Sequence, residues 1–181
     1  MTLFTFAPQA DRKALRNVTA LAVCAGAAVV LFLSLGLRFN LTSSHAPVGL
    51  WRACPAAGAI RIGDVITYDI REFYAAKPEM TEDRLTFAAP RIMKRVAALP
   101  GALIELSGDA LVVDGKEYSQ ARLAKGWRKV DYPLVVPEGT VWLMDDVLAA
   151  YDSRYHGPLP LRLVKEKNEP LWVRERRPAA Q

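Results

Sequence analysis

The chain begins with a short charged segment that leads into a long apolar one. Residues 18–37 form a run of twenty without a charged side chain. A helix rises about 1.5 Å per residue, so a run of this length spans the roughly 30 Å hydrocarbon core of a bilayer. We therefore predict a transmembrane anchor over residues 18–38, a tail over residues 1–17, and one domain over residues 39–181.

After the anchor, the pattern changes to short segments of strand length, separated by glycine and proline. Residues 64–70 alternate between two faces, as the side chains of a strand do. Asp114-Gly115 is a strong two-residue hairpin turn. Residues 134–136 and 141–144 flank a Pro-Glu-Gly turn and predict another strand pair. The pattern predicts a mainly β fold, an antiparallel and partly closed β domain behind one N-terminal transmembrane helix.

Residues 90–101 place a lysine where an apolar side chain is expected. If this segment is a strand, Lys94 shares a face with Ile92 and Val96. Burial disfavours the charged form of lysine and lowers its pKa, so a lysine on this face could act as a neutral general base. The alternative is an edge lysine whose stem covers apolar surface while its head group reaches water.

The charges are distributed unevenly along the chain. The formal net charge is +5, of which four basic residues and one acid in residues 1–38 give +3, leaving +2 for the domain. Such a balanced domain has no basic patch that would indicate nucleic-acid binding. Arg12, Lys13 and Arg16 precede the apolar run and only Arg38 follows it, which predicts a cytoplasmic N-terminus and a periplasmic domain. A cleaved secretory signal is the alternative for this segment.

Cysteine and histidine are too sparse to indicate a disulfide scaffold or a metal centre. Cys24 lies in the apolar run, so we do not expect it to pair with Cys54. His45 and His156 are far apart in sequence. The sequence therefore predicts neither a metal site nor a cofactor.

Two further motifs carry reactive or charged side chains. Ser44 lies three residues before Pro47, just after the anchor, and its hydroxyl would need a base such as Lys94 to act as a nucleophile. Linker polarity is the ordinary interpretation of such a serine. Asp152 and Arg154, two residues apart near the end of the chain, are expected to form a structural ion pair.

Together these motifs resemble the bacterial signal peptidase I family, and especially its TraF-type conjugative transfer peptidases. The resemblance rests on Ser44 with Pro47, on Lys94 in KRVAALPG, and on Asp152-Ser153-Arg154, in the family's order. It covers roughly residues 38–160. The sequence Gly49-Leu50-Trp51 after the proline resembles the TraF type in particular.

The resemblance implies a serine endopeptidase of the bacterial inner membrane that needs no cofactor. Ser44 and Lys94 would form the catalytic dyad, Thr42 and the Ser44 amide would bind the oxyanion, and Asp152 and Arg154 would support the site. Besides membrane lipid, the partner would be an exported precursor protein, with a conjugative pilin first among the candidates. TraF-type enzymes can also cyclise the pilin.

Several positions depart from the family pattern. TraF-like sequences often leave one residue between serine and proline, and that spacing would select His45 in place of Ser44. A serine that assists the lysine in many relatives falls at Ala150 here, and the family's Gly-Asp-Asn becomes Met144-Asp145-Asp146. Two alternatives therefore stay open, a general leader peptidase and a catalytically inactive, membrane-anchored β module of a secretion system.

Overall fold

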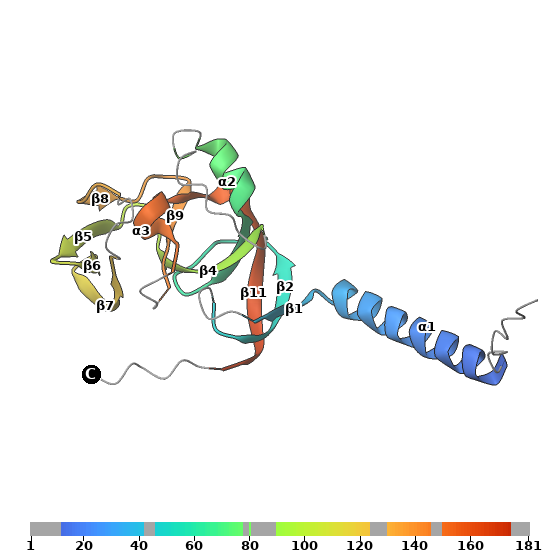
Figure 1. Cartoon of the computed structure of the whole chain (residues 1–181). Coiled ribbons are helices and arrows are strands. Elements are labelled where there is room, and N and C mark those ends of the chain that lie inside the picture. The colour runs from blue at the N-terminus through green and yellow to red at the C-terminus, as the bar shows by residue number, and fades with distance from the viewer. Residues whose placement is uncertain are drawn as a thin grey trace, which may run out of the picture. The chain divides into compact units, whose positions relative to one another are not determined.

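The computed structural model describes residues 12–41, 46–77, 80, 90–123, 130–145 and 150–174. The chain divides into two compact units, Met1–Leu37 and Arg38–Gln181. The second unit is mainly β, and its described strands form one sheet of seven strands and one of four (Figure 1). The prediction of a mainly β, antiparallel domain is confirmed. Strand order is linear in both described sheets, so neither closes on itself.

The seven-stranded sheet carries the segments of greatest functional interest. Its strand order is β1-β2-β11-β3-β4-β9-β10, and the pairings of β2, β3, β4, β9, β10 and β11 with their neighbours are antiparallel where the register is known. The strands are β1 (Leu37–Asn40), β2 (Gly49–Pro55), β3 (Val65–Asp69), β4 (Arg91–Ala98), β9 (Thr140–Leu143), β10 (Leu159–Pro160) and β11 (Val164–Val173).

Three short helical segments accompany this sheet. They are α2 (Ile70–Ala76), α3 (Ser153–His156) and the 3₁₀ turn η2 (Leu161–Leu163). Asp69 caps α2 by accepting a hydrogen bond from the Arg71 backbone N–H, which is one reason that the helix begins directly at the end of β3. The buried face of α2 presents Phe73 and Tyr74 to the core.

The four-stranded sheet has the order β7-β6-β5-β8 and lies on the side of the domain away from β1 and β2 (Figure 1). Asp114 and Gly115 form the hairpin turn between its strands β6 and β7 with φ of 48° and 78°, as the sequence predicts. Its strands are β5 (Leu103–Ser107), β6 (Ala110–Val113), β7 (Lys116–Arg122) and β8 (Leu134–Val135).

One predicted pairing is wrong. The strands on either side of the Pro-Glu-Gly turn do not pair with each other, because β8 joins β5 while β9 pairs with β4 and β10. The turn therefore connects the two sheets. A single hydrophobic cluster joins them, with side chains from both sheets that include Ile66, Ile92, Ile104, Leu111 and Trp142.

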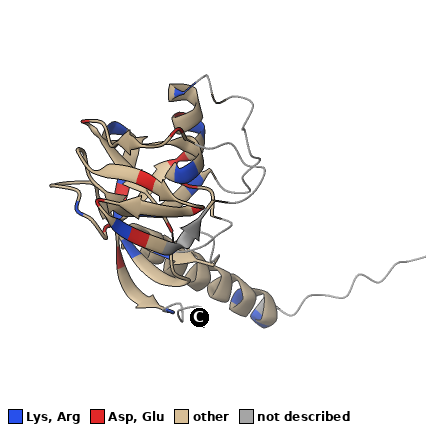
Figure 2. Ribbon diagram, turned by 90° about the vertical axis from the view of Figure 1, so that its left-hand side faces the viewer, with Lys and Arg blue, Asp and Glu red and all other residues tan. Residues whose placement is uncertain are grey.

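Charged side chains of both signs are interspersed over the domain. Figure 2 shows acidic and basic residues alternating along the strands of the visible face, without a face of one sign. Exposed pairs such as Arg71 with Asp69 and Lys165 with Glu72 account for part of this pattern.

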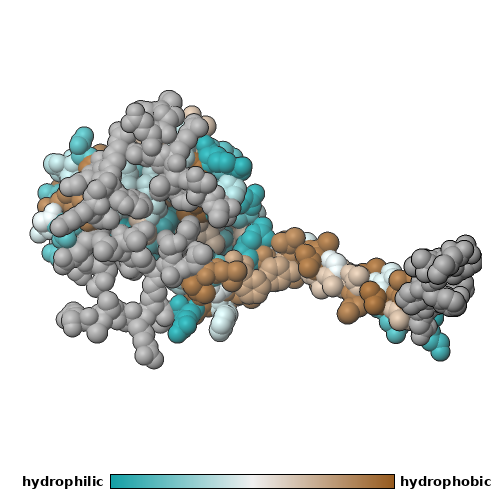
Figure 3. Space-filling model, viewed as in Figure 1, coloured by the Kyte–Doolittle hydropathy of each residue, from teal (hydrophilic) through white to brown (hydrophobic). Residues whose placement is uncertain are grey.

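The N-terminal unit contains α1 (Arg12–Ser34), and apolar side chains cover most of it (Figure 3). Residues Lys13–Ser34 are long and apolar enough to cross a membrane, and none of this helix is buried within the protein. The helix starts at Arg12, before the predicted start of the anchor at residue 18. It ends at Ser34, before the predicted end at residue 38, because Leu37 and Arg38 begin β1. The side of the membrane on which each end lies stays a prediction.

Candidate active site

Lys94 lies on the buried face of β4. Side chains alternate along this strand, so Ile92, Lys94 and Val96 share one face, and all three are buried as the sequence predicts. Only 1% of Lys94 is exposed. On the neighbouring strand β3, Ile66 lies opposite Lys94 in the register and is also fully buried. The edge-lysine alternative is therefore excluded.

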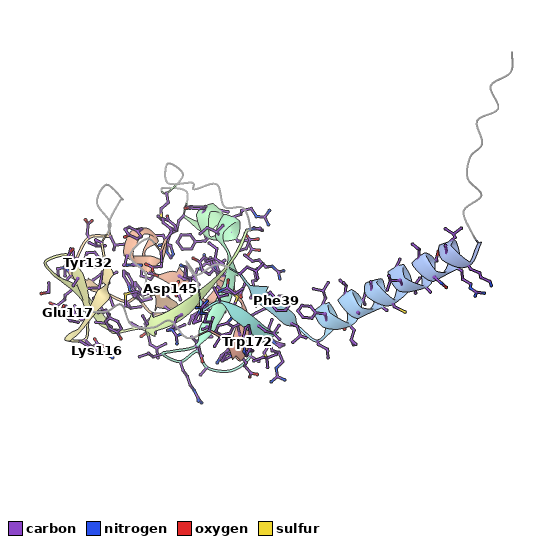
Figure 4. The ribbon with its side chains drawn as sticks, turned by 60° about the horizontal axis from the view of Figure 1, so that its bottom comes forward. Phe39, Lys116, Glu117, Tyr132, Asp145 and Trp172 are labelled. Carbon is purple, nitrogen blue, oxygen red and sulfur yellow. The ribbon has the colours of Figure 1, made fainter. Side chains whose placement is uncertain are left out.

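Lys94 nevertheless has a charged partner in the interior. Its Nζ donates a hydrogen bond of 2.8 Å to Asp145 Oδ2, and the side chain of Asp145 is only 4% exposed. Figure 4 shows Asp145 inside the domain, beside β4. The view of Lys94 as a lysine surrounded by apolar side chains is therefore incomplete, because a carboxylate contacts its amine.

Strand pairing brings Asp145 to this position. Leu143 at the end of β9 pairs with Val96 of β4, and the Met144 backbone N–H continues the ladder by donating to the Arg95 carbonyl at 3.0 Å. Asp145 is the next residue, so its side chain reaches Lys94 one step further along β4. The sequence places Asp145 at the family's Gly-Asp-Asn position but predicts no contact between Asp145 and Lys94.

Asp152 and Arg154 form the ion pair that the sequence predicts. Both side chains are fully buried, and Arg154 donates through Nε and Nη2 to the two carboxylate oxygens of Asp152 at 2.8 and 2.7 Å. Asp152 also caps α3. Burial by itself would lower the pKa of Arg154, but the hydrogen bonds and charge of Asp152 outweigh it and raise the pKa.

The same turn contacts the end of β9. Asp152 Oδ2 accepts from the Asp145 backbone N–H at 3.2 Å, and Ser153 Oγ accepts from the Leu143 backbone N–H at 2.9 Å. Hydrogen bonds thus run from Arg154 through Asp152 to the backbone of Asp145, whose side chain contacts Lys94. Ala150, at the position of the family's assisting serine, is fully buried and its carbonyl accepts from Arg154 Nη2.

His156 is a buried, neutral imidazole close to this network. Burial is the main reason that its pKa falls to about 3, and the positive charges of Lys77 and Lys94 contribute. Its Nδ1 lies 2.7 Å from the Gly157 carbonyl, which assigns the proton to Nδ1 and leaves Nε2 to accept from Tyr68 Oη at 3.3 Å. The pKa of Tyr68 is raised by burial and by the nearby Asp152 and Asp145 carboxylates.

The predicted nucleophile and oxyanion residues, Thr42 and Ser44, lie outside the described residues, as does His45. The structure does describe both flanks of this segment. The Asn40 side-chain amide donates to the carbonyls of Ala46 and Pro47, so it links the residues before and after the segment.

The flank after Ser44 packs against the strand of the lysine. Trp51 Nε1 donates to the Pro47 carbonyl at 3.1 Å, and Ala46 is fully buried in a small cluster with Trp51 and Val65. Met93, the residue before Lys94 on β4, packs on this cluster. Ala46, two residues after Ser44 in the sequence, thus lies by β4 on the face opposite to Lys94, since Met93 and Lys94 point to opposite faces of the strand.

The described residues contain no group of three His, Cys, Asp or Glu side chains that could hold a metal ion. The buried charged groups of the site instead form two ion pairs, Lys94 with Asp145 and Arg154 with Asp152. Such an arrangement can hold a lysine amine at a fixed position for proton transfer.

Comparison with known proteins gives consistent matches. The family model described as signal peptidase, peptidase S26, matches residues 12–172. The conjugal transfer protein TraF of Agrobacterium tumefaciens is 31% identical over 159 residues, which covers 82% of this chain and 89% of that protein. The protein of the same name from Agrobacterium fabrum is 31% identical over 144 residues, covering 74% of this chain and 80% of that protein.

Among solved structures, a signal peptidase I from Enterococcus faecalis is similar with a TM-score of 0.39 and 21% identity, over 62% of this chain and 98% of that one. The family match extends from the N-terminal helix through β4 and α3 to the end of β11, and so includes all the site segments described above. With that extent of match, this chain belongs to the signal peptidase family, peptidase S26.

Proposed function

We propose that this protein is a membrane-anchored serine endopeptidase in which Ser44 is the nucleophile and Lys94 the general base. The observation that carries the proposal is the buried amine of Lys94 on β4, the strand whose opposite face packs against the Ala46 flank of the serine segment. A serine hydroxyl needs a nearby base to become a nucleophile, and a lysine within the protein interior can supply one.

The reaction would begin with proton transfer inside the dyad. Neutral Lys94 would take the proton of Ser44 Oγ while Oγ forms a bond to the scissile carbonyl carbon. The Ser44 backbone N–H and the Thr42 hydroxyl would stabilise the resulting oxyanion. The Lys94 ammonium would then give its proton to the leaving amine as the C–N bond breaks, which leaves an acyl group on Ser44.

The second half of the reaction transfers that acyl group. With water as the acceptor, Lys94 would take a proton from water as it attacks the ester carbonyl and return it to Ser44 Oγ as the ester bond breaks, so the product would be a free carboxylate. With the N-terminal amine of the same precursor as the acceptor, the product would be cyclic. The two outcomes differ by one water, or about 18 Da, so the mass of the product distinguishes them.

The substrate class follows from the relatives and the anchor. The two similar TraF proteins are conjugal transfer proteins by name, which supports an exported precursor of a conjugation apparatus, with a pilin first among the candidates. The basic residues Arg12, Lys13 and Arg16 support a cytoplasmic N-terminus and hence a periplasmic peptidase domain. The precursor would bind as an extended strand with small side chains near the cut.

The proposal can be tested with the full chain in detergent micelles. The substrate is an internally quenched peptide with Ala-Gln-Ala before the scissile bond, since small residues mark exported precursors at their cleavage site. We expect the wild type to cleave it and Ser44→Ala to lose most of the activity, because removing one member of a catalytic unit removes nearly all of its effect.

Two neighbouring variants serve as matched controls. Ser43→Ala and His45→Ala alter the same segment but should keep most of the activity if Ser44 is the nucleophile. Activity in Ser44→Ala equal to that of the wild type would refute the assignment. Loss of activity in His45→Ala alone would assign the nucleophile position to His45, and no cleavage by the wild type would favour the inactive β module.

A further inference from the structure

We propose that Asp145 is a positioning residue for the proposed dyad of Ser44 and Lys94. It holds the Lys94 amine in place and stabilises the positive charge of this amine after proton transfer. This inference rests on the proposed function, because Asp145 acts only through Lys94. It assigns a role to a side chain for which the sequence predicts no contact with Lys94. Three observations support this role. They are the direct contact between Asp145 and Lys94, the hydrogen bonds that hold the backbone of residues 144 and 145, and the burial of both side chains.

The contact constrains the direction of the lysine side chain. A lysine has a flexible four-carbon stem, and freezing it costs conformational entropy. The 2.8 Å hydrogen bond to Asp145 fixes the end of this stem, and the packed face of β4 holds its base. A charge-assisted hydrogen bond of this length is roughly twice as strong as a neutral one.

Asp145 is itself held from two sides. Its neighbour Met144 is bonded to Arg95 of the lysine strand, and its own backbone N–H is bonded to Asp152. Asp152 is in turn fixed by two hydrogen bonds from Arg154. The carboxylate that contacts Lys94 is therefore as well supported as the strand that carries the lysine.

The charge of Asp145 acts differently before and after proton transfer. Before transfer, the carboxylate holds the amine in place through their hydrogen bond. After transfer, the proton from Ser44 Oγ is on Lys94 Nζ, and the adjacent carboxylate stabilises the new positive charge. The predicted result is activity that rises with pH toward an alkaline plateau.

Other ionisable side chains surround the pair and stay unchanged in the test. From β3 and the α3 turn they are Tyr68, Asp152, Arg154 and His156. Asp152 and Arg154 neutralise each other, and His156 is neutral above a pKa of about 3. A change in the pH profile on altering residue 145 therefore reports the charge at that residue.

The test compares pH profiles of peptide cleavage by the full chain in detergent, using the Ala-Gln-Ala peptide. In Asp145→Asn we expect the rising limb to move to lower pH, because the negative charge next to the base is lost. The plateau should fall about tenfold to a hundredfold, because the amine is held less well. Asp145→Glu keeps the charge but displaces it, so its limb should stay in place while its plateau falls.

The result that overturns the inference is equally specific. If Asp145→Asn and Asp145→Glu both keep the wild-type plateau, Asp145 does not position the lysine. If the limb of Asp145→Asn coincides with that of Asp145→Glu, the charge of Asp145 does not act on the base. Should Asp145→Asn fail to fold, a wild-type plateau in Asp145→Glu would still contradict the positioning role.

Two comparisons separate this inference from the proposed function. Glu169→Gln, a matched loss of one carboxylate from the exposed Arg52 pair, should keep both the plateau and the limb. If the wild type does not cleave, or if Ser44→Ala cleaves equally well, the proposed function fails. If cleavage depends on Ser44 but not on residue 145, only the role of Asp145 fails.

Discussion

Ion pairs of similar chemistry occur in two contrasting regions of this domain. On β2 and β11, Arg52 and Glu169 form a pair whose side chains are 52% and 55% exposed. Between β4 and the end of β9, Lys94 and Asp145 form a pair whose side chains are 1% and 4% exposed. Water solvates the first pair in both the folded and the unfolded chain, whereas the second pair loses its water on folding.

The two regions therefore have different consequences for stability. An exposed pair contributes little, because solvent screens it and the side chains lose conformational freedom. A buried pair costs desolvation energy that its attraction only partly offsets, so apolar residues of similar size are often as stable or more so. Buried charges retained at such a cost suggest a role other than stability, and here they lie at the proposed dyad.

The largest expected effect on stability comes from Arg154. Arg154→Met leaves the fully buried Asp152 carboxylate without its two side-chain donors. We expect the free energy of unfolding to fall by about 3–5 kcal/mol, with lower activity because the Asp145 segment loses its support. Urea unfolding monitored by circular dichroism measures this. Arg52→Met is the exposed control and should melt close to the wild type, and equal melting of both variants would contradict the contrast.

Lys94 gives a comparable effect that a second change should reverse. Lys94→Met leaves Asp145 buried beside an apolar group, and we expect a loss of about 3–5 kcal/mol in unfolding free energy. The double variant Lys94→Met with Asp145→Leu should recover most of that stability, because neither charge remains. Neither variant should cleave the peptide. If Lys94→Met alone were as stable as the wild type, this buried pair would behave like an exposed one.

His156 predicts a smaller, pH-dependent effect. Its pKa is about 3 in the folded protein against an ordinary value of 6.5, so between these values the unfolded chain binds the proton more readily. The contribution of neutral His156 to the free energy of unfolding is fully present above about pH 6.5 and is lost as the pH falls toward 3. The loss between pH 6.5 and pH 5 should be about 2 kcal/mol. Thermal melts across this range should show a weaker pH dependence in His156→Gln, and an unchanged dependence would assign the effect to another group.

Asn40 should have the smallest effect on stability and a larger one on activity. Asn40→Ala removes the donor to the Ala46 and Pro47 carbonyls, which should cost about 1–2 kcal/mol. Since these bonds link the two flanks of the serine segment, we expect kcat to fall more than this stability change alone explains. Asn40→Asp places a buried carboxylate against the same two carbonyl oxygens and should be destabilised further. Full activity in both variants would show that the hydrogen bonds from Asn40 to the Ala46 and Pro47 carbonyls are not needed for catalysis.

Local patterns in the sequence predicted the parts of the fold that depend on neighbouring residues. Alternation identified β3 and β4 and the burial of Lys94, and Asp114-Gly115 identified the hairpin between β6 and β7. Strand β8 has only two residues, too few to show a pattern, and its position in the sheet is determined by its pairing with β5. Strand β11 was missed, because it is mostly polar and contains Pro170, next to which its register shifts.

The site was predictable where a motif carried it and unpredictable where a long-range register did. Lys94 and the pair of Asp152 with Arg154 lie in short recognisable segments. The contact between Lys94 and Asp145 joins residues 51 positions apart, and it exists because β9 pairs with β4 in one particular register. No pattern within either segment specifies that register.

The central claim is that Ser44 forms a covalent bond to the acyl half of the substrate with Lys94 as the base. The most direct measurement is intact mass spectrometry of the full chain, quenched with acid during turnover of the Ala-Gln-Ala peptide, followed by peptide mapping. We predict an acyl adduct on Ser44 in the wild type and none in the double variant Lys94→Met with Asp145→Leu, provided that it is folded. An adduct on Ser43 or His45, or an adduct on Ser44 that forms equally fast without Lys94, would contradict the account.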